Sequence, residues 1–256
     1  MYFAQFLKAR LEYKVDFFAT LFSSIVTALT GLLFIVFLMD NKTIAELNGW
    51  SRDEVLFIYG YAQIPTALFL TVSQNLYSFG DRYVVQGQFD KVLVRPLNSL
   101  FQILFESFNM EVLGNLVLGI LVMAYANRGV GFSFGVTDIL WLLVSSVSGA
   151  LILISVFVVL ASLSFHFEDK MGVAAPFYNL MHMARYPLPI FNRAIQLILS
   201  WVVPFGFVAF YPATHFFKKE GFAVYCYLTP LMAVACMFVA GISWKYGVSK
   251  YSSAGN

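Results

Sequence analysis

The sequence predicts an all-α polytopic membrane protein, and two observations predict it: the composition and the length of the apolar runs. Hydrophobic residues make up 60% of the 256 residues and charged residues only 12%, about half the charged fraction of a soluble domain. Five apolar runs are long enough for helices that cross a bilayer, which need about 20 residues each. These runs cover residues 17–39, 55–75, 101–125, 139–163 and 222–244. The formal net charge of +2 indicates no nucleic-acid partner.

Residues 1–16, before the first run, are expected to form a helix that lies in the membrane interface. Apolar residues recur every four positions from Phe3 to Val15, and charged residues recur at the same spacing from Lys8 to Asp16. Such stripes lie on separate faces of a helix, as in helices that rest on a membrane surface. The alternative is a solvated start to the first span.

The distribution of Lys and Arg predicts that both termini lie in the cytoplasm. With the N-terminus inside, nine of the 16 Lys and Arg residues fall on the cytoplasmic side and five fall outside, in agreement with the positive-inside rule. Five spans would leave the C-terminus outside together with Lys245 and Lys250. A sixth span is therefore expected between the fourth run and the last.

Two positions remain open for this additional span. A helix over 190–210 is the more apolar, but Pro204 and Gly206 interrupt it, and both residues disfavour a continuous helix. The alternative is a more polar span over 170–186, followed by a broken, re-entrant element over 188–217. The residues alone do not decide between these two positions.

The chain contains no pattern for catalysis, nucleotide binding or metal binding. A phosphate-binding loop needs a Gly-Lys pair before Ser or Thr, and the sequence has no Gly-Lys dipeptide. The His residues lie on separate segments without the spacing of metal ligands. Residues 131–135 match the G-x-S-x-G pattern of hydrolases, but they lie between two expected spans. We expect no enzyme activity and no cofactor on this chain.

Acidic residues inside a span are costly and are candidates for function. Glu106 lies near the cytoplasmic end of the third run, where a structural ion pair with a basic residue such as Arg95 or Lys8 is expected. Glu111 lies deeper, and Asn115 shares its helix face. Glu111 and Asn115 are therefore candidates for a polar translocation path. Structural pairing between helices is the alternative.

The loop between the second and third runs, residues 77–98, has an unusual pattern. Charges of both signs alternate with apolar and aromatic residues, and Gly87 and Pro96 interrupt the pattern. A flexible loop would not need so many apolar residues. They indicate a short helix that docks against a protein on the cytoplasmic side.

Three motifs in the chain are similar to those of a known family. They are Gly87-x-Phe89-Asp90-x-x-Leu93-x-Arg95-Pro96-Leu97, Tyr186-Pro187-Leu188-x-Ile190-Phe191, and Val203-Pro204-Phe205 followed by Phe210-Tyr211-Pro212-Ala213. With these motifs the sequence resembles, over nearly its whole length, the permease subunits of type-2 ABC exporters. The resemblance is to a branch of bacterial permeases that are encoded beside a second permease and an ATPase.

The resemblance implies six transmembrane helices, an N-terminal interfacial helix, a cytoplasmic coupling helix within 77–98 and a re-entrant element over 188–217. It therefore favours 170–186 as the fifth span. Asn179 and His182 make that span polar, so we expect it to face protein or a cavity, and both residues join the translocation-path candidates. The implied location is the bacterial cytoplasmic membrane, with several spans and both termini inside.

The resemblance also implies export that is driven by ATP hydrolysis on separate ATPase subunits. The coupling helix would carry their motion into this chain and a second permease subunit, which is either a copy or a different chain. Phe89, Val92 and Leu93 are the expected apolar anchors on the ATPase. Asp81, Arg82, Asp90 and Arg95 are expected to be either polar contacts with the ATPase or braces of the loop, and Pro96 belongs to the same contact. A loop that packs only on its own chain is the alternative.

The alternative function is a secondary transporter or channel that an ion gradient drives. Such a protein needs an acidic residue deep in a span and often has two related halves. Glu111 meets the first condition in part, but no internal symmetry is visible. A membrane scaffold without transport activity is a third class. Membrane lipid is a partner in every case, and the sequence identifies no cargo.

Overall fold

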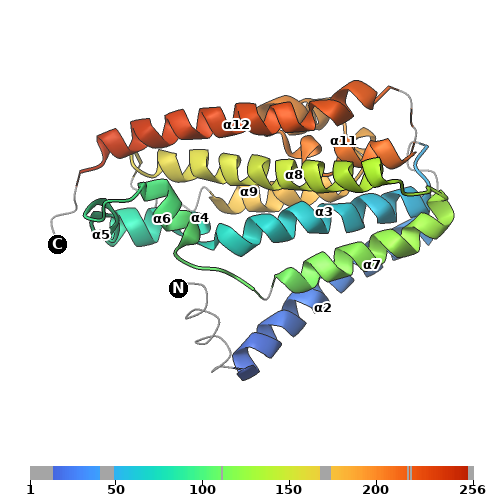
Figure 1. Ribbon diagram of the computed structural model, residues 1–256, viewed down its shortest axis with the longest axis horizontal. Coiled ribbons are helices and arrows are strands. Elements are labelled where there is room, and N and C mark those ends of the chain that lie inside the picture. Colours follow the sequence, from blue (N-terminus) through green and yellow to red (C-terminus); the bar gives the residue numbers. More distant parts are fainter. Residues whose placement is uncertain are drawn as a thin grey trace.

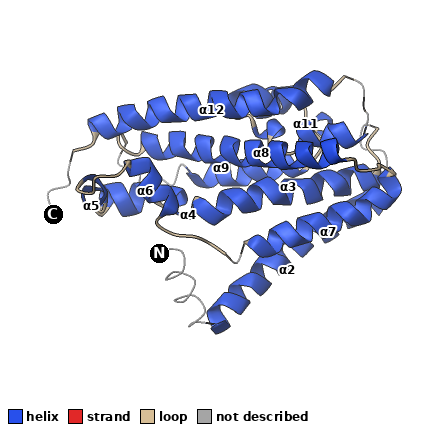
Figure 2. Cartoon of the chain, viewed as in Figure 1, coloured by secondary structure: helices blue, strands red, loops and turns tan. Residues whose placement is uncertain are grey.

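The structure is a computed structural model that describes residues 14–40, 49–110, 112–167, 174–217, 219 and 221–252. Every element in these segments is a helix or a helical turn (Figure 2). Most of the interfacial helix predicted over residues 1–16 lies outside the described residues, and the last three of those residues belong to the first described helix.

Five helices are long and apolar enough to cross a membrane, which confirms the all-α polytopic class. They are α2 (Lys14–Asp40), α3 (Arg52–Val72), α7 (Leu113–Val130), α8 (Val136–Leu163) and α12 (Ala223–Lys250). Figure 1 shows α3, α8 and α12 side by side along the long axis, and α8 packs against both neighbours. The short helices α4, α5 and α6 lie at one end of this bundle, which we call the α5 end.

Local polar groups determine where the long helices begin and end. The Ser51 hydroxyl accepts a hydrogen bond from the Glu54 amide at the start of α3, and the Glu54 carboxylate accepts one from the Ser51 amide. This reciprocal pair satisfies two amides that the first helical turn leaves free. The Asp138 carboxylate accepts from the Gly135 amide at the start of α8. Gly131 ends α7 with φ +70°, a conformation that favours glycine.

The helices α3 and α7 cross in close contact. A Cβ atom on Gly119 would lie 2.6 Å from the carbonyl oxygen of Gly60 and 2.7 Å from the Gln63 Cβ. A Cβ atom on Gly60 would lie 2.8 Å from the carbonyl oxygen of Gly119. Glycine at both positions therefore lets the two backbones touch, which is how small residues promote helix packing in membranes.

The continuous helix predicted over 101–125 is not present. The chain forms α6 (Ser99–Phe105), leaves the helix, and resumes as α7 (Leu113–Val130). In the interruption, the backbone amide of Asn109 donates to the Thr71 carbonyl of α3 at 2.9 Å, and not to a carbonyl one helical turn earlier in its own segment. Polar side chains at this break can compete with the helix for backbone hydrogen bonds. Hydropathy could not locate the break, because long apolar runs flank these side chains.

The segment where the fifth span was predicted, 170–186, contains a short helix. α9 (Ala174–Met181) and the 3-10 turn η2 (His182–Arg185) together hold 12 residues. At about 1.5–2.0 Å per residue they extend roughly 20 Å, which is less than the roughly 30 Å hydrocarbon core of a bilayer. Residues 170–173 lie outside the described part of the chain.

A bent element follows, and it excludes the straight helix considered over 190–210. Residues Arg193–Val202 and Phe205–Phe217 form two arms that meet at 76°. The arms consist of α10 (Arg193–Leu197), η4 (Ile198–Val202), η5 (Phe205–Phe207), α11 (Phe210–Ala213) and η6 (Thr214–Phe217). Pro204 lies in the break, where it cannot supply the amide that a continuing helix would need.

The second arm of the bent element reaches the middle of α8. A Cβ atom on Gly149, the midpoint of α8, would lie 2.6 Å from the carbonyl oxygen of Val208. The arm ends beside the first turn of α8, where the His215 Nε2 lies 2.8 Å from an Asp138 carboxylate oxygen. The element therefore reaches the centre of the bundle and returns to the end opposite α5.

Candidate functional site

The predicted coupling loop folds as a compact segment at the α5 end. It follows α4 (Gln74–Tyr77) and contains the π-helical turn η1 (Gly80–Val85) and the helix α5 (Phe89–Leu93). Gly87 has φ +68° and lets the chain reverse between these two turns. We call residues 77–98 the coupling segment.

Phe89 fixes this segment to the rest of the chain. Its side chain is fully buried and packs edge-on against several aromatic rings, which belong to the ends of α8 and α12 and to the coupling segment itself. The ring centroids lie 5.0 Å away for Phe165, 6.1 Å for Trp244, 4.9 Å for Tyr251 and 6.0 Å for Phe79. Val92 is also buried, and its carbonyl accepts a hydrogen bond from Gln102 of α6.

Two of the three expected anchors therefore face this chain instead of a partner. Phe89 and Val92 are buried, whereas Leu93 is 47% exposed. Its neighbours Val94 and Leu97 are 85% and 63% exposed. We call Leu93, Val94 and Leu97 the apolar tip. A helix of five residues is too short for its periodicity to show which side faces inward, so the sequence could not separate these roles.

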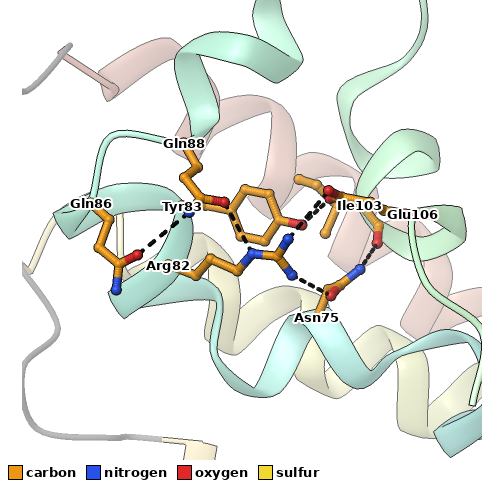
Figure 3. A network of polar contacts seen from close by, with 7 residues as sticks. All are labelled: Asn75, Arg82, Tyr83, Gln86, Gln88, Ile103 and Glu106. Carbon is orange, nitrogen blue, oxygen red and sulfur yellow. Dashed lines mark hydrogen bonds and ion pairs between the residues drawn. The ribbon is translucent and has the colours of Figure 1, made fainter. Parts of the chain in front are cut away.

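A polar network holds the coupling segment on α4 and on the residues after α6 (Figure 3). The Arg82 guanidinium donates to the side-chain oxygens of Asn75 and Gln88, each at 3.1 Å, and lies 3.4 Å from the Glu106 carboxylate. The Tyr83 hydroxyl donates to the same carboxylate. Burial and this hydrogen bond raise the pKa of Tyr83. Glu106 is thus paired within the chain, with Arg82 as its partner.

The remaining polar residues of the segment divide into internal braces and exposed groups. The Asp81 carboxylate accepts from the Gln86 side chain at 3.0 Å. The Asp90 carboxylate accepts from the Tyr251 hydroxyl at 3.0 Å; burial and this hydrogen bond raise the pKa of Tyr251 to about 12. Arg95 and Pro96 are exposed beside the apolar tip.

A cavity of about 660 Å³ lies inside the bundle. Its walls come from α2, α3, α4, α7, α8, α9, η2 and the interruption before α7, and it extends from Arg185 to Tyr77 at the start of the coupling segment. Two translocation-path candidates, Asn115 and His182, line this cavity. Asn179 is exposed and does not line it, and Glu111 lies outside the described residues.

The structure adds polar residues to this cavity that the sequence did not single out as translocation-path candidates. Among them are Gln63, Thr66, Asn109 and Arg185. Gln63 and Thr66 are three residues apart in an otherwise apolar run, a spacing that places both on one helix face. That spacing could have predicted which face of α3 lines the cavity. The contribution of Asn109 depends on the unpredicted break before α7.

Residues 25–255, most of the chain, match the model of a family described as ABC-2 family transporter protein. The chain belongs to the ABC-2 transporter family. Comparisons with curated proteins and with solved structures gave no match.

Membership of the ABC-2 family makes this chain a membrane subunit of an ABC transporter. In such a transporter the ATPase activity lies on a separate subunit. Two features of this ABC-2 protein lie next to each other: the coupling segment with its exposed apolar tip, and the cavity of mixed polar and apolar wall that begins beside it.

Proposed function

We propose that this ABC-2 chain is the permease subunit of an exporter, and that a separate ATPase docks on the coupling segment from the cytoplasm. The exposed apolar tip, Leu93, Val94 and Leu97, carries this proposal. Protein interfaces have an apolar centre and a polar rim, and the exposed Lys91 and Arg95 supply such a rim. The export direction rests on the resemblance of the sequence motifs, as does the second permease subunit.

The braces beneath the tip give the segment two mechanical connections. Phe89 contacts rings at the ends of α8 and α12. Arg82 and Tyr83 contact Glu106 at the interruption before α7. A displacement of the tip by an ATPase would therefore move the ends of α8 and α12 and the interruption before α7, because packed side chains transmit displacement with little compression.

Val94→Asp tests the docking site. We expect it to weaken co-purification of the partner ABC ATPase with this chain at least ten-fold, because a carboxylate at the centre of an apolar interface loses its hydration. The matched control is Val136→Asp. Val136 is 77% exposed at the opposite end of the bundle, and it lies in the first turn of α8, where an Asp side chain is tolerated. Equal ATPase recovery with both variants would contradict docking on the apolar tip.

Cysteine labelling of intact cells tests the proposed orientation. In a background without Cys226 and Cys236, we expect Val136→Cys to react with a membrane-impermeant maleimide. Leu97→Cys should react only after permeabilisation, because we place the α5 end in the cytoplasm. The reverse labelling pattern would place the coupling segment outside and exclude a cytoplasmic ATPase contact there.

The family match counts against the alternative, a secondary transporter or channel that an ion gradient drives, because membership of the ABC-2 family makes this chain a membrane subunit of an ABC transporter. Recovery of a well-folded chain without the ATPase, under conditions that preserve membrane complexes, would contradict ATPase docking on the coupling segment.

A further inference from the structure

Arg185 is a cation in the wall of the bundle's cavity. Among the described residues that line the cavity it carries the one permanent charge. The described part of the chain shows a contact of its guanidinium with the Tyr59 ring at 5.9 Å, and neither a hydrogen bond nor an ion pair to it. An ionised side chain within a membrane bundle is costly and usually has a functional partner. A guanidinium prefers the two oxygens of a carboxylate or phosphate as that partner.

Four other side chains of the wall also have buried polar atoms without a partner in the described part of the chain. Buried side-chain atoms of Gln63, Asn109, Asn115 and His182 form no hydrogen bond within the described residues. Most buried polar atoms in proteins are paired, so four unpaired atoms around one cavity indicate a site that a ligand completes. Rotation of the side-chain amides of Gln63, Asn109 and Asn115 would turn their donors and acceptors toward that ligand. The unpaired oxygens of the two Asn residues require donors on it.

Part of the remaining wall is apolar, and the volume limits the size of the ligand. Phe69, Leu70, Val112 and Phe157 line the cavity together with the polar residues. A volume of about 660 Å³ lies in the range of small-molecule sites, roughly 300–1,000 Å³. It suits a head group with part of an alkyl chain and excludes a folded protein.

We propose that this cavity binds an amphiphile whose head group carries a carboxylate or phosphate together with at least one N–H or O–H donor. Arg185 binds the anionic group, the amides of the wall bind the donors, and the apolar wall holds the start of the alkyl chain. As a statement about cargo, this inference rests on the proposed export function. Binding itself requires no ATPase, so it is measured on the isolated full chain.

The probe is tritiated N-dodecanoylserine, and the protein is the full chain in phosphatidylcholine nanodiscs, with empty nanodiscs subtracted. We expect saturable binding of about one probe per chain. The uncharged competitor N-dodecanoylserinamide should displace the probe at least ten-fold less well than unlabelled N-dodecanoylserine, because a charge-assisted hydrogen bond is about twice as strong as a neutral one. Absence of saturable binding, or equal displacement by both compounds, would overturn the proposal without any variant.

Arg185→Gln should weaken probe binding at least ten-fold and abolish the preference for the anionic compound. Arg193→Gln is the matched control, because Arg193 is exposed and does not line the cavity. Full binding by a folded Arg185→Gln protein would overturn the assignment of the anion to Arg185. Val94→Asp should bind the probe as the unmodified chain does, which separates failure of this proposal from failure of ATPase docking.

Nanodiscs that contain phosphatidylserine identify the source of the ligand. This lipid has an anionic head group with an ammonium donor, so it competes with the probe if the site takes membrane lipids. If it does not compete while the probe binds, the site takes a free amphiphile. Both results support the chemistry of the site, provided that Arg185→Gln removes the binding.

Discussion

Gly119→Val should prevent α7 from packing on α3 and leave little folded protein. The nearest groups to the new side chain would be the Gly60 backbone and the Gln63 Cβ, at 2.6 and 2.7 Å from the added Cβ. Neither can rotate away, so the two helices would have to separate. We expect a loss of at least about 3 kcal/mol, the upper range for overpacked sites. Fluorescence-detected size exclusion and the midpoint of thermal unfolding in detergent measure the effect.

Gly241→Val in α12 is the matched control for this substitution. A Cβ atom at Gly241 would have no neighbour within 4 Å, so the same chemical change should leave elution and unfolding unaltered. If Gly119→Val behaved like the control, the close crossing of α3 and α7 would not be a determinant of the fold.

Phe89→Ala should destabilise the isolated chain by about 3–5 kcal/mol, the usual cost of removing a large buried aromatic side chain. The surrounding rings of Phe165, Trp244 and Tyr251 belong to this chain, so no ATPase is needed for the effect. Thermal unfolding and limited proteolysis of the coupling segment measure it. Leu97→Ala, at an exposed position, should stay within about 0.5 kcal/mol of the unmodified chain.

The opposite result, a stable Phe89→Ala chain that binds the ATPase poorly, would support the role predicted from the sequence, in which Phe89 anchors the loop on the ATPase. If Phe89→Ala left the isolated chain stable and reduced only ATPase binding, the ring would have to leave its internal pocket and enter the partner. A normal unfolding midpoint together with weak co-purification would therefore identify Phe89 as a docking residue.

Composition and run length were enough to predict the helical membrane class, because a bilayer admits few other structures. Four of the five apolar runs overlap long helices closely. The third did not, since the chain breaks where Glu106 pairs with Arg82 and the Asn109 amide pairs with Thr71. Those partners are distant in sequence, and hydropathy contains no information about them.

The coupling segment shows the same limit at the level of single residues. Its mixture of charges and aromatic residues correctly indicated a short helix within 77–98. Whether an apolar side chain faces its own chain or solvent depends on the ends of α8 and α12, which approach the segment only in the folded bundle. Likewise, Asn115 and His182 could be selected as polar residues, but only the fold brings them to one cavity with Arg185.

The position of Tyr251 has a practical consequence for anyone who expresses this protein. Its ring packs on Phe89 at 4.9 Å and its hydroxyl binds Asp90, so the residue directly after α12 helps to support the coupling segment. Affinity tags or fluorescent reporters fused close to this tyrosine would disturb the support, and a truncation after Lys250 would remove it. Reporter placement therefore belongs at the opposite end of the bundle, for instance in the turn that contains Gly131, where no heavy atom lies within 4 Å of an added Cβ.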